Sequence, residues 1–470
     1  MSARAANSGK KVTFVDPTEF TPQFAWRKAP REKGIEHVFC VEVDLVAAAS
    51  SFGTPSYLYS RAAVTAAYEE LERGLGKTAH TICFAVKSSG NLSILSHLAK
   101  LGSGFDIVSG GELEHLRRLG VRGNRIVFSG VGKTRQEIRD ALRYSPSSRA
   151  GRIVHRGGGI LLFNVESEAE LEVLLEESER HARRGGKIPN VAIRVNPDVA
   201  AGGHPHISTG KHTHKFGLDW PEARRLYLAH KESKYLRWKG ISAHIGSQIV
   251  SLEPFRRAFR RIAGYVEELR RAGIELKYLD IGGGLGVRYT NEKTSLRLDY
   301  ARMVAGLVRP LGLHLLLEPG RSIIASAGIL LTRVIYTKRN RGKTFVVVDA
   351  AMNDLLRPAL YGAVHPITRV AREARGRKIP AQRVDIVGPV CETGDCLLHD
   401  WPLGEVKTGD LLAIWVAGAY GMVQASNYNA RTRPSEVLID GSRTKLIRRR
   451  ETQDDLLRMD ALASTRRPRF

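Results

Sequence analysis

The feature that most constrains this chain is an alternation of strand-like and helix-like segments between residues 81 and 317. Short apolar runs have the length and composition of buried strands, and helical spacing of apolar residues follows most of them. Because parallel strands are joined by crossover helices, this alternation favours a parallel sheet. Eight repeats over about 240 residues predict an α/β fold, a closed parallel (β/α)8 barrel. The expected strands are residues 81–86, 104–108, 125–128, 160–163, 191–195, 239–244, 277–281 and 313–317.

The pattern changes on both sides of this barrel. After about residue 325, β-like runs separated by Gly and Pro replace the alternation, at 345–349, 383–387 and 411–416. These runs predict a second, mostly β domain. We expect four parts: a loosely ordered N-terminal extension over 1–35, an N-terminal segment over 36–60 that joins the β domain, the barrel over 61–325 and the C-terminal β domain over 326–470.

Composition narrows the possible functions. A formal charge of +25 attracts anionic substrates and allows nonspecific contact with nucleic acid. The charge is spread along the chain, and no module with interleaved aromatic residues is evident, so we expect no nucleic-acid partner. No run approaches the roughly 18 apolar residues that a membrane helix needs. The four cysteines form no CxxC pair, which argues against a zinc site and fits a reducing, cytoplasmic compartment.

Polar residues stand at the carboxyl ends of several expected barrel strands, where barrels of this kind carry their chemistry. Lys87 follows the first strand, His244 ends the sixth, residues 282–284 (Gly-Gly-Gly) follow the seventh, and Glu318 follows the eighth. These groups should therefore share one rim. Desolvation at such a mouth should let Lys87 lose its proton readily. A neutral lysine amine is the group that forms a Schiff base with an aldehyde cofactor.

The other three groups suit the same cofactor. Glycines let backbone amides approach an anion closely, so the triple glycine can hold a phosphate. Glu318 can keep a pyridine nitrogen protonated, and a protonated ring is the stronger electron sink, which favours decarboxylation over racemisation. An ordinary helix-capping carboxylate would fit the same spacing. His244 can stack on a flat ring, and a core histidine bonded to the backbone is an equally good interpretation.

A second set of candidates lies in the expected β domain. A partly exposed Cys391 can deliver a proton, and the adjacent Glu392 can bind an amine; a buried cysteine beside a turn carboxylate is the alternative. Arg357 and Tyr361 lie four residues apart, and a guanidinium fork suits a carboxylate. The pattern around Arg357 is also that of an ordinary surface arginine.

Long motifs in a fixed order connect these residues. From about Phe52 to Glu451 the chain resembles the meso-diaminopimelate decarboxylase family, of the alanine-racemase-like class of pyridoxal-phosphate enzymes. The resemblance implies that the chain uses pyridoxal 5′-phosphate to decarboxylate meso-2,6-diaminopimelate to L-lysine and CO2, the last step of lysine biosynthesis. The motifs are FAVKSSGN, GSGFDIVSGGEL, FNVESEAEL, RVNPDV, HPHISTG with KFG, HIGSQ, DIGGGLG, EPGRS, DAAMNDLLRPALY, GPVCETGD, GAYG and SNYN.

The resemblance also implies roles for single residues. The catalytic set would be Lys87, which binds the cofactor covalently, Cys391, which donates a proton, and His244, which stacks on the ring. The cysteine segment would reach the barrel mouth of a second subunit, giving a homodimer with shared active sites. Residues implied to bind the cofactor are Lys87, Asp106, His244, Ser247, Gly282, Gly283, Gly284, Glu318, Pro319, Gly320, Arg321 and Tyr420. Residues implied to bind the substrate are Arg321, Arg357, Tyr361, Glu392 and Tyr420; no metal is implied.

Some positions depart from the family pattern. Ser88 and Ser89 replace the usual Ala-Asn, and Ala351 replaces a usual glycine and could perturb its turn. A Gly- and Arg-rich insertion over 146–159 is also atypical, and we expect a surface loop there.

Two other functions stay open at this stage. One is an ornithine- or arginine-type decarboxylase, against which Arg357 with Glu392 argues, because such substrates have no distal carboxylate. The other is a non-catalytic relative that binds the cofactor, against which the presence of Lys87, Glu318 and Cys391 argues.

Overall fold

The computed structural model describes residues 15–147, 158–199, 215–374 and 382–461. Its centre is a closed barrel of eight parallel strands, so the predicted fold class is confirmed. The last strand pairs with the first through Leu315 and His80, which closes the ring. The barrel strands are β5 (His80–Ala85), β6 (Gly104–Ile107), β7 (Ile126–Phe128), β8 (Leu162–Val165), β9 (Asn190–Arg194), β10 (Arg237–Ser242), β11 (Tyr278–Asp280) and β12 (His314–Leu317).

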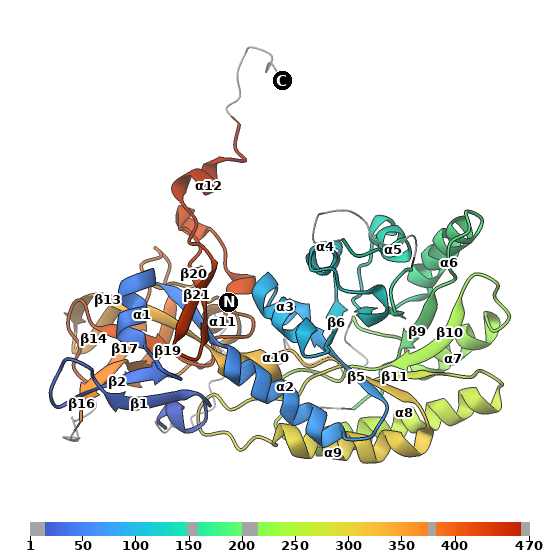
Figure 1. Cartoon of the computed structure of the whole chain (residues 1–470), viewed down its shortest axis with the longest axis horizontal. Helices are drawn as coiled ribbons and strands as arrows, with labels where there is room; N and C mark the ends of the chain where they lie inside the picture. The colour runs from blue at the N-terminus through green and yellow to red at the C-terminus, as the bar shows by residue number, and fades with distance from the viewer. Residues whose placement is uncertain (1–14, 148–157, 200–214, 375–381, 462–470) are drawn as a thin grey trace, which may run out of the picture.

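Helices cover the outside of this barrel (Figure 1). Ser167 caps α6 by accepting a hydrogen bond from the backbone N–H of Glu170. The Glu170 carboxylate accepts from the backbone N–H of Glu166 and from Lys133. The helices on the barrel side are α2 (Arg61–Leu75), α3 (Leu92–Lys100), α4 (Gly110–Arg118), α5 (Arg135–Leu142), α6 (Glu168–Ala182), α7 (Trp220–Ala229), α8 (Glu253–Arg271), α9 (Arg297–Val308) and α10 (Arg321–Ile324).

Two apolar layers hold the barrel together. The main core packs the strands against the surrounding helices and continues into the β domain. A smaller cluster takes one residue from each of six barrel strands, as expected for the inward-facing layer of a filled barrel. Its members are Cys83, Val127, Leu162, Ala192, Tyr278 and Leu316. The barrel is therefore a packed scaffold, and polar groups are left to its rim.

The β domain is built around the long strand β13 (Gly328–Asn340) and lies beside the barrel in Figure 1. Its nine-stranded sheet has the order β18-β17-β14-β13-β4-β20-β21, with β19 also paired to β13 and β15 paired to β19. Strands from both ends of the chain therefore meet in one sheet. They are β4 (Ser56–Ser60), β14 (Lys343–Val348), β15 (Ile367–Arg369), β17 (Arg383–Val387), β18 (Cys396–Pro402), β19 (Leu411–Ile414), β20 (Ser435–Asp440) and β21 (Arg443–Arg448).

The N-terminal region differs from expectation. Residues 24–28, placed in a loosely ordered extension, form β1 (Phe24–Lys28), which pairs antiparallel with β2 (Ile35–Cys40). A short β3 (Val43–Asp44) and β16 (Ala371–Glu373) also pair with β2. The Asp44 side chain then accepts from the N–H of Val46 and starts a helix, α1 (Leu45–Phe52), rather than continuing a strand.

Three segments complete the description. Short helices α11 (Arg357–Tyr361) and α12 (Gln453–Leu457) follow strands of the β domain. Most of the 146–159 insertion lies outside the described residues. Among the helices that the structure describes, none has the length and apolar character needed to cross a bilayer.

Candidate active site

Lys87 stands at the barrel rim on a single turn, η2 (Val86–Ser88), directly after β5. Its Nζ lies 2.7 Å from Oδ2 of Asp106, which comes from the neighbouring strand β6. The carboxylate is fully buried, whereas the lysine side chain keeps 36% of its surface exposed. The two strands thus deliver an ion pair to the rim, with the amine on the open side.

The charge state of Lys87 corrects one expectation. Burial alone would lower the pKa of this amine, as the sequence suggested. The negative charges of Asp106 and Glu318 raise the pKa and together outweigh the effect of burial, so the pKa of Lys87 is raised. The prediction of a readily deprotonated lysine is therefore wrong for this arrangement, because it counted desolvation and ignored the acidic neighbours.

Glu318 belongs to a buried acidic group at the same rim. Burial raises its pKa well above the ordinary value, and the charges of Asp106 and Asp280 raise it further. Ser129 donates to its Oε1 at 3.2 Å, and Asn164 donates to Asp280 Oδ2 at 2.7 Å. A buried carboxyl in such a group is stabilised by a proton or by a cationic partner.

Sequence reasoning missed three members of that group as site residues. Asp280 ends β11, Asn164 lies in β8, and Ser129 directly follows β7. A signal was available, because each stands at or near the carboxyl end of an expected barrel strand. Reading every strand end for polar residues, and not only four of them, would have found all three.

The segment after β11 comes so close to its neighbours that it admits no side chains. A Cβ on Gly283 would lie 2.2 Å from the carbonyl oxygen of Glu318, and one on Gly284 would lie 2.4 Å from that of Gly246. Gly282 has φ +64° and would clash with His244. Glycine is therefore required here by close backbone packing, with Gly282 and Gly283 buried and Gly284 half-buried, and the glycine-lined anion site stays a prediction.

His244 follows β10 and faces these glycines. Its Nδ1 accepts a hydrogen bond from the backbone N–H of Gly283 at 3.1 Å. Burial lowers the pKa of the imidazole well below its ordinary value, and the cations Arg194 and Lys87 lower it further. The ring is therefore neutral and fixed by the backbone; stacking on a planar cofactor stays a prediction.

A cavity of about 450 Å³ opens beside this rim. Arg321 and Arg357 both line it, and both are largely buried, with 6% and 5% of their surface exposed. The interpretation of Arg357 as a surface arginine is therefore wrong. Its guanidinium is held inside by His365, whose Nε2 lies 2.7 Å from Nη1. Other residues that line it include His244, Ser247, Gln248, Glu292, Tyr361, Tyr420 and Gln424.

Tyr289 joins the two guanidiniums. Nη1 of Arg321 donates to its hydroxyl at 2.7 Å, and Nη1 of Arg357 donates to the same oxygen at 3.0 Å. Burial would raise the pKa of this phenol, but the two cations outweigh burial and lower it. Sequence reasoning missed Tyr289, since no local pattern reveals that two arginines distant in the sequence share one hydroxyl. Ser247 Oγ accepts from the far side of Arg321 at 3.2 Å.

Tyr420 connects the β domain to the rim. Its backbone N–H donates to the carbonyl of Ser88 at 2.9 Å, and its ring lies 4.9 Å from the guanidinium carbon of Arg321. It lines both the arginine cavity and a second cavity of about 470 Å³ that includes Lys87. Tyr361, also on the arginine cavity, accepts from Gln424 at 3.3 Å.

The residues that depart from the family pattern fit without distortion. Ser88 is buried, and its hydroxyl donates to the carbonyl of Ala85 at 2.8 Å. The rim closes behind it, because Pro319 accepts from the N–H of Ala85 and a Cβ on Gly320 would lie 2.8 Å from the Ser88 hydroxyl. Ala351 is also buried, and its φ is not positive. Its N–H donates to Asp354 at 2.9 Å, so the expected perturbation of that turn is absent.

Cys391 and Glu392 lie elsewhere, on the exposed loop between β17 and β18. The backbone N–H of Cys391 donates to Asn429 at 3.3 Å, and Glu392 accepts from the hydroxyl of Tyr428 at 2.9 Å. Neither residue lines the two cavities of its own chain. The alternative of a buried structural cysteine is excluded, but a single chain does not bring this pair to the rim.

The barrel region matches a known family. Residues 61–325 fit the family described as pyridoxal-dependent decarboxylase, pyridoxal binding domain. The diaminopimelate decarboxylase of Pseudomonas aeruginosa is 47% identical over 425 residues, which cover 90% of this chain and 97% of the relative. That of Neisseria meningitidis is 45% identical and covers 88% of this chain and 97% of the relative.

Solved structures agree with the sequence relatives. Diaminopimelate decarboxylase from Helicobacter pylori, solved in complex with L-lysine, has a TM-score of 0.80 and 39% identity, covering 88% of this chain and 99% of that one. The enzyme from M. jannaschii has a TM-score of 0.82 and 34% identity, covering 94% and 98%. A lysine/ornithine decarboxylase from Vibrio vulnificus, at 22% identity, shares only the fold. The chain therefore belongs to the diaminopimelate decarboxylase family of pyridoxal-dependent decarboxylases.

Proposed function

We propose that this chain decarboxylates meso-2,6-diaminopimelate to L-lysine and CO2, the last step of lysine biosynthesis. One observation carries the choice of substrate. Beside the rim that holds Lys87, two buried guanidiniums of Arg321 and Arg357 line a single cavity. Such a cavity suits a substrate that keeps a second carboxylate after the first has left.

The rim fits pyridoxal 5′-phosphate, the cofactor of this family. Oδ1 of Asp106 is buried without a hydrogen-bond partner among the described residues, as is Nε of Arg321. The acidic group around Glu318 suits a cationic ring nitrogen, and the glycine segment 282–284 carries no side chain that would keep a phosphate from the backbone. When bound, this cofactor supplies an electron sink for the electrons released with CO2.

We assign the chain's own groups as follows. Lys87 binds the cofactor aldehyde covalently, and Asp106 orients its amine. With the cofactor bound, Glu318 would pair with the protonated ring nitrogen, and His244 would support the ring. Gly282, Gly283, Gly284 and Ser247 bind the phosphate, while Pro319 and Gly320 set the position of Glu318 and Arg321.

The substrate end uses both domains. Arg321, Arg357 and Tyr361 bind the distal carboxylate, and Tyr420 lies between this cavity and Lys87, where it can contact cofactor and substrate. Glu392 binds the distal amine of the substrate. Cys391 donates a proton to the α-carbon after CO2 has left.

The positions of Cys391 and Glu392 favour a homodimer with shared active sites. Both side chains are exposed, and neither lines a cavity of its own chain. A loop of this kind can complete the rim of a second subunit in a two-fold symmetric pair.

Mixing two inactive variants tests the shared site. Lys87→Ala and Cys391→Ala subunits, each inactive alone, should recover activity when they are dissociated and reassociated together. Random pairing makes half of the dimers mixed, and one of the two sites in each mixed dimer is intact, so about a quarter of wild-type activity is expected. No recovery in verified mixed dimers would contradict shared sites and leave the reaction itself untouched.

An assay of CO2 release tests the substrate. Diaminopimelate should be preferred over ornithine, arginine and lysine by about 100-fold or more in kcat/KM, because these three substrates lack a distal carboxylate and leave the buried guanidiniums without an anion. Equal turnover of ornithine would favour the alternative decarboxylase. No CO2 from any of these, with the cofactor bound, would favour a non-catalytic relative.

We also infer a cytoplasmic location. All four cysteines are free, and Cys391 is exposed. A reducing compartment preserves such thiols. Cell fractionation should recover the protein with cytoplasmic enzymes, and recovery with membranes would contradict this.

A further inference from the structure

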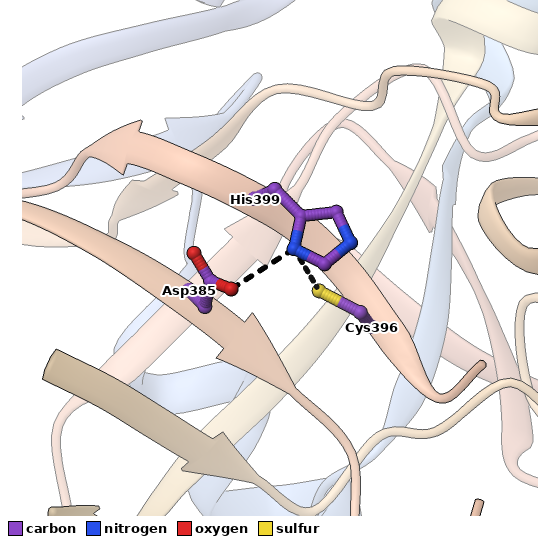
Figure 2. A group of neighbouring side chains, drawn as sticks. All are labelled: Asp385, Cys396 and His399. Carbon is purple, nitrogen blue, oxygen red and sulfur yellow. Dashed lines mark hydrogen bonds and ion pairs between the residues drawn. The ribbon is translucent and has the colours of Figure 1, made fainter. Parts of the chain in front are cut away.

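Three metal-ligating side chains converge outside the site described above, on the strand pair β17–β18 of the β domain. Asp385 belongs to β17, whereas Cys396 and His399 belong to β18 (Figure 2). Nδ1 of His399 lies 2.9 Å from Oδ2 of Asp385 and 3.3 Å from Sγ of Cys396. All three ligand atoms lie within 4.8 Å of one another.

Irregular strand pairing creates this convergence. Residues three apart on a regular strand, such as Cys396 and His399, point to opposite faces of the sheet. Here Cys396 pairs with Val387, Leu398 with Ile386 and Trp401 with Val384, so β18 has one extra residue at each of two places. These bulges re-aim the strand and bring Cys396 and His399 to the same face, the face of Asp385.

The geometry excludes a nucleophilic triad. In a triad the histidine uses one ring nitrogen for the carboxylate and the other for the nucleophile. Here Nδ1 alone contacts both Asp385 and Cys396, so the three ligand atoms meet at one point (Figure 2). Convergence on a point is the arrangement that a bound ion requires.

We propose that Asp385, Cys396 and His399 form a site for Zn²⁺ or a similar thiophilic divalent cation. Carboxylate oxygen, thiolate and imidazole are all zinc ligands, and bond lengths of about 2.0–2.3 Å in a tetrahedron separate ligand atoms by roughly 3.3–3.7 Å. The separations of His399 from Asp385 and from Cys396 need only a small expansion, and the Asp385–Cys396 separation is at most 4.8 Å. The exposed side of His399 leaves the fourth position to water. The argument against zinc from absent CxxC pairs overlooked Cys396-x2-His399.

One side chain competes with the cation. Nζ of Lys343 lies 2.6 Å from the same Oδ2 of Asp385, but the lysine side chain is 54% exposed and can move into solvent. The other carboxylate oxygen accepts the backbone N–H of Asp400 at 2.9 Å, which fixes its orientation. The site also lies at the base of the loop that carries Cys391 and Glu392, because that loop joins β17 to β18.

Zinc titration of the untagged, full-length, cofactor-loaded enzyme tests the proposal. Equilibrium dialysis with metal analysis should find one Zn²⁺ per chain. Cys396→Ser and His399→Gln should each weaken binding at least about 10-fold, because loss of even an outer partner costs that much. Lys343→Met should tighten binding by removing the ammonium. His230→Gln, at the end of barrel helix α7, is the matched control and should change nothing.

Co²⁺ gives a second readout. Its visible ligand-field bands should show tetrahedral coordination in the wild-type enzyme and should be lost in Cys396→Ser. Decarboxylation by each variant verifies that it has folded, so lost binding cannot come from lost structure. Dialysis that leaves the wild-type chain without Zn²⁺ would overturn the proposal. So would an ion retained equally by a Cys396→Ser/His399→Gln double variant.

Discussion

The barrel rim and the β17–β18 loop are built in opposite ways. At the rim, Lys87, Asp106 and Glu318 are packed against one another, and each has named partners within the same chain. On the loop, Cys391 and Glu392 are exposed, and their hydrogen bonds go to residues outside both cavities. The charged groups of the rim are therefore gathered within one chain. The loop carries a thiol and a carboxylate, but neither of them lines a cavity of its own chain that could bind a substrate.

This difference separates two kinds of sensitivity. A change at the rim should disturb cofactor binding and chemistry together, because the proposed roles give the same residues both the binding of the cofactor and its activation. A change on the loop should leave the cofactor in place and affect only the later proton transfer. Spectra of the bound cofactor, recorded beside the rates, distinguish the two.

The largest effect is expected for Lys87→Ala. Removal of the amine deletes the covalent attachment, so kcat/KM should fall by roughly 10³-fold or more and the visible absorbance of the bound cofactor should change. Lys100→Ala, an exposed lysine at the end of α3, is the control and should keep both. Full turnover by the Lys87 variant would contradict the assigned role.

Cys391→Ala should have the next largest effect. Loss of a general acid costs about 10²–10⁴-fold, so kcat should fall within that range while cofactor absorbance and affinity stay as in the wild type. Measured in D2O, the wild type should show a solvent isotope effect that the variant changes. If kcat were unaffected, Cys391 would not be the proton donor. The loop would then have no part in proton transfer that distinguishes it from the rim.

Tyr289→Phe should produce a smaller effect, confined to substrate binding. The variant removes the hydroxyl that accepts from both Arg321 and Arg357, so the two cations repel each other without that acceptor between them. A charge-assisted hydrogen bond contributes about 1.5–3 kcal/mol, so KM for diaminopimelate should rise about 10-fold or more, with kcat little affected.

A control sharpens this test. Tyr428→Phe removes a hydroxyl that lies between β19 and β20 and donates to Glu392 of the loop. If Tyr289 positions the guanidiniums, only its variant should weaken inhibition by dicarboxylates that lack amines. Equal inhibition of both variants would mean that Tyr289 is only a packing residue.

Sequence alone predicted the barrel well, for a physical reason. Strand and helix periods are local, so all eight strands were located to within a few residues, and fixed rules of barrel topology then gathered Lys87, His244 and Glu318 on one rim. The two bulges in β18 were not predictable in this way. They depend on the pairing with β17, and the one-face arrangement of Cys396 and His399 exists only after that pairing has formed.

Electrostatic consequences were the least predictable. A pattern can show that Lys87 is near the rim, but the sign of its pKa shift depends on the balance between burial and two carboxylates from other strands. The same holds for Arg357, whose burial depends on His365 and Tyr289 as partners. The balance of burial and charge effects depends on distances between side chains, which sequence spacing does not provide.

The smallest effect concerns a carboxylate that supports the barrel frame and takes no part in the chemistry. Glu177 of α6 is buried, and Arg139 and Arg135 of α5 donate to it, so the pKa of its carboxyl is lowered to about 2. A lowered pKa stabilises the folded state above the unfolded value of about 4.3, and this contribution is lost as pH falls toward 2.

Glu177→Gln should therefore reduce stability at pH 7 by about 1–2 kcal/mol, since the partly exposed arginines are screened by solvent. The difference in Tm between wild type and variant should shrink as pH falls from about 4.5 toward 2. The values of kcat and KM at neutral pH should not change, because Glu177 contacts α5 and not the rim. A pH-independent difference would trace the loss to packing, and altered kcat would mean that the frame and the rim are coupled.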